Sequence, residues 1–424
     1  MKNKSALHLL LTANVVSGFA QGISMIAIPW YFIDMLGKGS LFAMITAGIT
    51  IVSLFWSLYA GTLIDRYLRK NIFLTINVIG FFILGSVAVS GFANGEIPIW
   101  LVAAVFCFTL LNFQIHYPNL YAFGQEITEK KNYGKTNSLI EIQGQATNMI
   151  SGGFAVFLLV GVDEKTMEIF GLESLNLHIE PWALHEIFLL DACTYFVAFF
   201  IVIFIKYIPI KKLEVHTGTI ITRIKTGLKF LLGNKPLLIF GTMPYAVFIT
   251  VLVAAHLLLP MYVSNHLNKG AEIFAICEIL FSLGALSAGI WVRKVFKNIH
   301  YTAGILVLML ITAAGVFLCA FTNNVLCFLL FSLAFGLANA GIRILRITFL
   351  FNHIPNNLIG RSGSIFNQFQ IICRFGFLML FSVPFFSYEN NVVVAFFICG
   401  IFILASAIPL VAVYKKLVGM KELE

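Results

Sequence analysis

A short charged run separates two long apolar segments early in the chain and reads Gly61-Thr62-Leu63-Ile64-Asp65-Arg66-Tyr67-Leu68-Arg69-Lys70. The apolar segments that meet at this run cover about residues 41–64 and 71–92. Each is long enough to cross a bilayer as an α-helix, which takes about 20 mostly apolar residues. Because charged side chains are costly inside a bilayer, the run is predicted to be a loop at a membrane surface. We call Gly61–Lys70 the charged loop.

The same alternation of apolar segments and polar loops covers the whole chain. Of its 424 residues, 59% are hydrophobic and 11% are charged, and the mean hydropathy is +0.93. Soluble globular proteins carry about 25% charged residues, so these values exclude that class, and the apolar excess excludes a disordered chain. The fold class predicted is an all-α membrane protein with twelve transmembrane helices, near residues 7–33, 41–64, 71–92, 97–121, 137–161, 185–206, 236–264, 270–292, 300–321, 325–351, 361–386 and 391–414.

The distribution of Lys and Arg predicts how these helices are oriented. With a cytoplasmic N-terminus, 22 of the 28 Lys and Arg residues fall on the cytoplasmic side, and only Lys38, Lys165 and Lys269 fall in outer loops. Cytoplasmic loops are enriched in Lys and Arg, so both termini are predicted to be cytoplasmic and the protein to be multi-pass in the cell (inner) membrane. The net charge of +9 is therefore explained by topology and does not indicate nucleic-acid binding.

The two halves of the chain resemble each other. Gly134-Lys135-Thr136-Asn137-Ser138 precedes the fifth span, and Gly360-Arg361-Ser362-Gly363-Ser364 precedes the eleventh, 226 positions later. Two parallel six-helix repeats are the architecture of one large transporter fold. The predicted domains are an N-terminal six-helix bundle at 1–206, a cytoplasmic linker with an amphipathic helix at 207–235, and a C-terminal six-helix bundle at 236–424.

The charged loop resembles the G-x-L-x-D-R-x-x-R-K signature of the major facilitator superfamily, and it lies at the expected place between spans two and three. Within that superfamily the layout is similar to the macrolide-efflux and siderophore-export branch, on the basis of His116-x-Pro118, Asn137-Ser138, Asp191 and Gly360-Arg361. The resemblance implies a secondary active transporter that works by alternating access. It also implies a cytoplasmic gate in which Asp65 meets the N-terminus of span eleven near Arg361. The gating residues so implied are Gly61, Asp65, Arg66, Arg69, Gly360 and Arg361.

Polar residues inside the spans recur at helical spacing, which places them on one face of each helix. Span ten carries Asn339, Arg343 and Arg346 in this way. Polar groups are costly in lipid unless they face partners or water, so these faces are predicted to line a cavity; helix–helix hydrogen bonding is the alternative for the uncharged ones. The predicted substrate-binding residues are Arg343, Arg374, Asn339, Asn367, Gln370, Gln21, Gln145 and Asn148.

Four ionisable residues within spans are candidates for proton coupling, and they are Asp191, Glu141, Glu278 and His116. A carboxyl group in such a place can take up and release a proton. Two alternatives stay open. Glu278 could form a structural ion pair with Arg343 or Arg374, and His116 could simply be a hydrogen-bonded histidine near a helix end.

These features favour a secondary active exporter, an antiporter that moves an amphiphilic small molecule outward against protons. Uptake or facilitated transport of an anionic, lipid-like or metal-chelate substrate is the alternative. No G-x-x-x-x-G-K-[ST] loop occurs, so ATP is not expected to drive transport directly. We expect no enzymatic activity, no metal site and no cofactor beyond the proton gradient. The expected partners are a small amphiphilic or anionic substrate and the lipid bilayer, with no nucleic acid, and the protein is expected to act as a monomer. The acidic loop at 162–184 is the only feature that hints at a receptor or scaffold.

Overall fold

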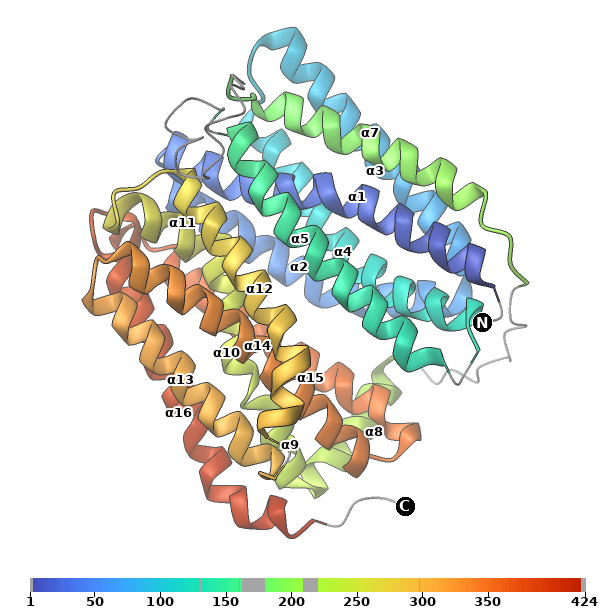
Figure 1. The fold of residues 1–424 in the computed structure, drawn as a ribbon, viewed down its shortest axis with the longest axis vertical. Coiled ribbons are helices and arrows are strands. Elements are labelled where there is room, and N and C mark those ends of the chain that lie inside the picture. The colour runs from blue at the N-terminus through green and yellow to red at the C-terminus, as the bar shows by residue number, and fades with distance from the viewer. Residues whose placement is uncertain are drawn as a thin grey trace. The chain divides into compact units, whose positions relative to one another are not determined.

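The computed structural model describes residues 3–129, 132–159, 161, 180–208, 220–296 and 298–420. Within these ranges the regular structure is entirely helical, as predicted (Figure 1). The first part of the chain forms α1 (Lys4–Trp30), η1 (Tyr31–Met35), α2 (Gly39–Arg66), α3 (Arg69–Asn94), α4 (Ile99–Ile127), α5 (Tyr133–Leu159) and α7 (Leu184–Ile203). The second part forms α8 (Ile220–Gly233), α9 (Lys235–Thr242), α10 (Tyr245–Val253), η3 (Ala254–Leu258), α11 (Leu259–Met261), η4 (Tyr262–His266), α12 (Ala271–Val295), α13 (Tyr301–Phe321), α14 (Val325–His353), α15 (Asn356–Phe381), η5 (Pro384–Ser387) and α16 (Val392–Val418).

Eleven helical stretches among the described residues are long and apolar enough to cross a membrane. The broken segment from α9 to η4 counts as one of them, Lys235–His266. Helix α5 is 27 residues long but more polar, and it coincides with the span predicted at 137–161. The all-α membrane fold is therefore confirmed, while the count of twelve spans and the cytoplasmic termini stay predictions.

The chain folds into two compact units. Two helices, α2 and α12, each belong partly to one unit and partly to the other. Unit 1 comprises Met1–Gly37, Phe55–Leu213 and Gly270–Ile279, and unit 2 comprises Lys38–Leu54, Glu214–Lys269 and Leu280–Glu424. Helix α2 therefore begins in unit 2 and ends in unit 1, and α12 begins in unit 1 and ends in unit 2. In unit 1, α7 packs along α3 and α1, and in unit 2, α13 packs between α14 and α16 (Figure 1). The domain boundaries given above rest on the sequence repeat and stay a prediction.

A second internal repeat becomes visible at the ends of η1 and η4. The sequence Pro29-Trp30-Tyr31-Phe32-Ile33-Asp34-Met35-Leu36-Gly37-Lys38-Gly39 matches Pro260-Met261-Tyr262-Val263-Ser264-Asn265-His266-Leu267-Asn268-Lys269-Gly270 at Pro, Tyr, Leu, Lys and Gly, 231 positions later. Both segments end in a π-helical turn. Gly37 and Asn268 then adopt left-handed backbone with φ of 61° and 51°, a conformation open to Gly and tolerated by Asn. Sequence and backbone together support descent of the two halves from one repeat.

Helices α12 and α14 cross in unit 2 with their backbones in direct contact. A Cβ atom at Gly284 would clash with the carbonyl oxygen of Leu333, and one at Gly336 would clash with that of Phe281. The two glycines face each other's helix, so each makes room for the other's backbone. Small residues at such crossings are a general device of membrane helix packing.

We expect Gly336→Ala to destabilise the protein, because the added methyl group must push two backbones apart. The expected cost is about 1–3 kcal/mol, or a fall in Tm of roughly 5 °C, in a thermal-unfolding measurement on the detergent-solubilised protein. Gly289→Ala on α12 is the matched control, because a Cβ atom there meets nothing within 4 Å. Equal Tm values for both variants would show that the close crossing does not contribute to stability.

Candidate functional site

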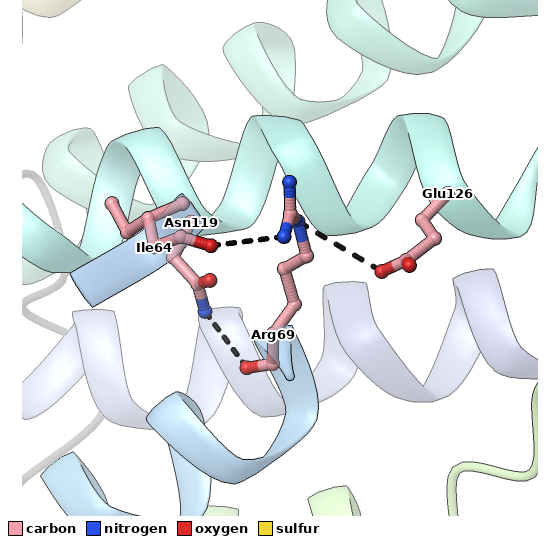
Figure 2. Close-up of polar contacts among 4 residues, drawn as sticks. All are labelled: Ile64, Arg69, Asn119 and Glu126. Carbon is pink, nitrogen blue, oxygen red and sulfur yellow. Dashed lines mark hydrogen bonds and ion pairs between the residues drawn. The ribbon is translucent and has the colours of Figure 1, made fainter. Parts of the chain in front are cut away.

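The prediction of a loop over Gly61–Lys70 is wrong for most of its residues, because Gly61–Arg66 complete α2 and Arg69 begins α3, which leaves only Tyr67 and Leu68 between the helices. Arg69 of this segment contacts three helices of unit 1. Its Nη1 donates a hydrogen bond to the carbonyl oxygen of Ile64 at the end of α2, at 2.9 Å. Its Nε lies 3.8 Å from Oε2 of Glu126 on α4, and its own carbonyl oxygen accepts a bond from Nδ2 of Asn119, at 3.0 Å. Figure 2 shows these three contacts converging on Arg69. The end of α2, the start of α3 and the C-terminal third of α4 are thus held together by Arg69.

The other cations of the charged loop have different partners. Lys70 Nζ donates to the carbonyl oxygens of Ile203 and Ile205, at 2.7 and 2.9 Å, and so caps the C-terminal end of α7. Arg66 is exposed and lies 5.8 Å from the ring centroid of Tyr67. The surroundings of Gly61 and the side chain of Asp65 lie outside what the structure describes.

The second half of the implied gate departs from the sequence prediction. Helix α15 begins at Asn356 after Pro355, not near residue 361, because proline before the first turn favours helix initiation. Arg361 is therefore in the second turn of α15 rather than at its N-terminus, and it is exposed. Its backbone packs against α8, where a Cβ atom at Gly227 would lie 2.9 Å from the Arg361 carbonyl. The surroundings of Gly360 lie outside what the structure describes.

Asp191 lies in a buried polar cluster of unit 1 formed by α1, α4 and α7. Its side chain is fully buried, and Oδ2 accepts a hydrogen bond from Ser24 Oγ at 2.8 Å. Its Oδ1 has no hydrogen-bond partner among the described residues. One turn along α7, the Tyr195 hydroxyl accepts bonds from Gln21 Nε2 at 3.1 Å and Asn112 Nδ2 at 3.0 Å. Gln21 is thereby engaged in helix packing.

His116 contacts α1 close to a small cavity. Its Nε2 lies 2.7 Å from Asn14 Oδ1, and because an amide oxygen only accepts, Nε2 carries the hydrogen. The cavity offers about 10 Å³ to the centre of a water molecule, which is room for about one water. Its polar lining consists of Asn14, Ser17, Asn77 and His116. His116 is thus hydrogen-bonded within unit 1, beside a cavity with room for about one water molecule.

Glu141 is hydrogen-bonded on the polar face of α5. Its Oε2 accepts from the Tyr121 hydroxyl of α4 at 3.0 Å, and its Oε1 accepts from Gln145 Nε2 at 3.3 Å. The structure therefore brings together two predicted site residues, Glu141 and Gln145. Asn148, one turn further, is exposed.

Glu278 belongs to the part of α12 that lies in unit 1. A Cβ atom at Gly152 of α5 would lie 3.6 Å from the Glu278 Cβ, so the glycine allows α12 to approach α5 closely. Arg343 and Arg374 belong to unit 2. The ion pair predicted between Glu278 and one of these arginines stays a prediction.

Two arginines of unit 2 differ sharply in their surroundings. Arg346 is buried, donates from Nη1 to the carbonyl oxygen of Gly241 at 3.2 Å, and lies 3.6 Å from the ring centroid of Tyr245. Arg374 on α15 has a buried Nε without a hydrogen-bond partner among the described residues, and so has Nε2 of Gln370 one turn before it. Asn339, Arg343 and Asn367 are partly buried.

Two side chains of these clusters escaped the sequence analysis, Tyr121 and Tyr195. Tyr195 carried a usable signal, because it follows Asp191 at i+4 and so shares its helix face. Tyr121 shares no such spacing with a charged residue of its own helix, and it meets Glu141 only through the packing of α4 on α5. Aromatic residues are too frequent here, with 43 Phe and 13 Tyr, to stand out without a structure.

Comparison with known proteins decides the family. The sequence profile of the Major Facilitator Superfamily matches residues 10–376. The chain belongs to this superfamily. It is therefore a multi-pass membrane transport protein and not an enzyme. No curated protein sequence matches the chain significantly.

Solved transporters share the fold of this superfamily member over almost their whole length. A bacterial homologue of the human lysosomal transporter Spinster, in an inward-facing and unoccupied conformation, has a TM-score of 0.73 at 9% identity, with 98% of each chain covered. A D-xylose–proton symporter has a TM-score of 0.70 at 13% identity, with 97% of each chain covered. The nucleoside transporter NupG has a TM-score of 0.67 at 14% identity, covering 97% of this chain and 99% of its own. Such low identities establish the fold alone.

We expect Arg69→Met to lower stability, because the Ile64 carbonyl loses a donor and Glu126 loses its ion-pair partner, while the Asn119 bond to the backbone carbonyl of residue 69 is kept. The expected loss is about 1–3 kcal/mol, measured as a fall in Tm in detergent. Arg66→Met is the control, since this exposed neighbour is expected to change stability by less than about 0.5 kcal/mol. A larger fall for Arg66→Met would contradict the bracing role of Arg69.

Proposed function

We propose that this transporter is a proton-coupled exporter of an amphiphilic small molecule, related to the macrolide-efflux and siderophore-export branch and working by alternating access. The observation that carries the proposal is Asp191, a fully buried carboxyl group with one hydrogen bond and one unpartnered oxygen. The same proposal includes cytoplasmic termini, a place in the cell membrane and a monomeric state.

The surroundings of Asp191 suit a group that changes its protonation state. A buried carboxylate without a positive partner is strongly unfavourable. The Lys and Arg residues of unit 1 lie at helix ends or in loops, so no cation from a helix interior offsets this charge among the described residues. Uptake of a proton removes the cost, and its release restores it. The Ser24 hydroxyl holds the carboxyl group in place through both states.

Glu141, Glu278 and His116 are secondary candidates for the proton path. Glu141 already accepts two hydrogen bonds, and His116 already donates one. Both groups are therefore already engaged within unit 1. Among the described residues Glu278 has no such hydrogen bond, and the close approach of Gly152 to its Cβ places it where α12 packs against α5.

The substrate residues in the proposal are the polar faces of α5, α14 and α15. Gln145 and Asn148 contribute from α5, Asn339 and Arg343 from α14, and Asn367, Gln370 and Arg374 from α15. Gln21 acts indirectly, through Tyr195. The gating residues are those of the charged loop and the start of α15, namely Gly61, Asp65, Arg66, Arg69, Gly360 and Arg361. Because Arg69 joins α2, α3 and α4, the loop would move with unit 1 as a rigid body.

Uptake or facilitated transport of an anionic, lipid-like or metal-chelate substrate is the second candidate. The arginines within unit 2 favour it, because a positive charge inside a membrane protein attracts an anion. A measurement of flux under an imposed pH gradient distinguishes the two candidates, since an exporter driven by protons responds to the sign of that gradient.

We expect transport to follow a pH gradient and to depend on Asp191. Compounds that raise Tm are first found among macrolides, hydroxamate siderophores and lysophospholipids, and their flux is then measured in proteoliposomes with an imposed pH gradient. Asp191→Asn is expected to retain binding but lose most of the gradient-driven flux, because the amide keeps the Ser24 bond and carries no exchangeable charge.

Glu186→Gln is the matched control on the same helix. Glu186 caps the start of α7 by accepting from the backbone N–H of Ala183 at 2.6 Å, and a glutamine can do the same. Flux that is indifferent to the gradient, or equally lost in both variants, would refute proton coupling through Asp191.

A further inference from the structure

Almost all charged residues that the structure describes in unit 2 are basic. Between its described helices and loops, unit 2 has a single acidic residue, Glu389, which lies between η5 and α16. Its membrane-spanning helices carry Arg343, Arg346 and Arg374. No described helix of unit 2 therefore supplies a carboxylate to these arginines.

The three arginines differ in the groups that contact them in place of a carboxylate. Arg346 donates from Nη1 to the Gly241 carbonyl and lies over the face of the Tyr245 ring, although its Nε, too, is buried without a hydrogen-bond partner among the described residues. Arg343 also interacts within the structure. Arg374 has neither a hydrogen bond nor a carboxylate partner among the described residues, and its Nε is buried. Arg374 is thus the intramembrane arginine for which the described residues of unit 2 supply neither a hydrogen-bond acceptor nor a carboxylate.

A second unpartnered donor lies beside Arg374. Gln370 precedes it by four residues, so the two side chains share a face of α15. Gln370 is only 3% exposed, yet its Nε2 has no hydrogen-bond partner. Leaving a buried donor unsatisfied costs free energy, and such groups call for an explanation. Both groups here are N–H donors, so the missing partner is a hydrogen-bond acceptor.

The imidazole of His256 in η3 lies near enough to Arg374 for the two groups to interact electrostatically. The His256 Nδ1 is 2.7 Å from the Leu252 carbonyl oxygen, and since a carbonyl only accepts, Nδ1 carries the hydrogen. Helix α10, which runs into η3, packs against α15. The π-helical turn of η3 therefore brings an imidazole, and no carboxylate, to this part of α15.

From these contacts we infer that Arg374 and Gln370 form a subsite of unit 2 that binds the anionic group of the substrate, of the carboxylate class. A guanidinium and a carboxylate form paired, charge-assisted hydrogen bonds, and the Gln370 amide adds a third donor. The inference rests on the proposed transport function, and it narrows the substrate from amphiphilic to acidic amphiphilic. The apolar part of the molecule would contact the surrounding aliphatic and aromatic side chains.

The test compares carboxylates with their neutral amides. The probes are hexanoate and hexanamide, 1-naphthaleneacetate and 1-naphthaleneacetamide, and dodecanoate and dodecanamide. Binding to the full chain in nanodiscs is measured by equilibrium titration. At least one carboxylate is expected to bind about tenfold or more tightly than its amide, and Arg374→Gln is expected to abolish that preference. Lys415→Gln, which removes an exposed charge from α16, is the control and should leave the preference unchanged.

A second variant distinguishes loss of the subsite from loss of folding. Gln370→Glu places a carboxylate one turn from Arg374 and so supplies the missing partner within the protein. It is expected to abolish the carboxylate preference while Tm stays equal or rises. Equal binding of every acid and its amide by the wild type would overturn the subsite. So would an acid preference that survives either α15 variant.

Flux separates the subsite from the proposed function. Carboxylate binding that depends on Arg374, without flux of the bound acid, would support the subsite and count against export. Gradient-driven flux of a neutral amphiphile, with no acid preference in binding, would support export and refute the subsite.

Discussion

A polar group inside a bilayer must find its partner within the protein, because the hydrocarbon offers no water. This constraint explains most of the polar residues within the spans here. Asn112 and Gln21 converge on the Tyr195 hydroxyl, Asn119 holds the backbone at Arg69, and Arg346 lies between a carbonyl oxygen and an aromatic ring. Each contact joins helices that are distant in sequence. The polar residues therefore fix which helix faces meet, while the apolar residues supply the bulk of the packing.

Some buried polar atoms of both units are exceptions to this constraint among the described residues, and those at the two proposed sites differ in chemistry. At the site proposed in unit 1 the unpartnered atom is an acceptor, Oδ1 of Asp191, and at the site proposed in unit 2 the unpartnered atoms are donors, on Gln370 and Arg374. An acceptor with a negative charge is balanced by a proton, and a positively charged donor is balanced by an anion. Buried groups that the fold leaves unbalanced are the places where a transported species has most to contribute.

Hydropathy predicted the positions of the helices because crossing a bilayer demands about 20 apolar residues, and α13 at Tyr301–Phe321 falls on the predicted span 300–321. Helix starts were harder, since α15 begins five residues early, behind Pro355. Spacing also showed which polar residues share a face. Spacing could not show which of these side chains have hydrogen-bond partners, because Gln21 and Gln370 look alike in sequence. The packing of other helices gives Gln21 a partner, Tyr195, and leaves Nε2 of Gln370 without one among the described residues.

The repeat itself offers a reason for the division of charge. Asn112, His116 and Asn119 of α4 recur 227 positions later as Asn339, Arg343 and Arg346 of α14. On α5 and α15, 226 positions apart, Glu141 corresponds to Asn367 and Asn148 to Arg374. Equivalent places are thus neutral or acidic in the first half and neutral or basic in the second. A duplicated bundle with identical charges could not treat a proton and an anion differently, whereas two bundles that diverged in sign can each bind one of them.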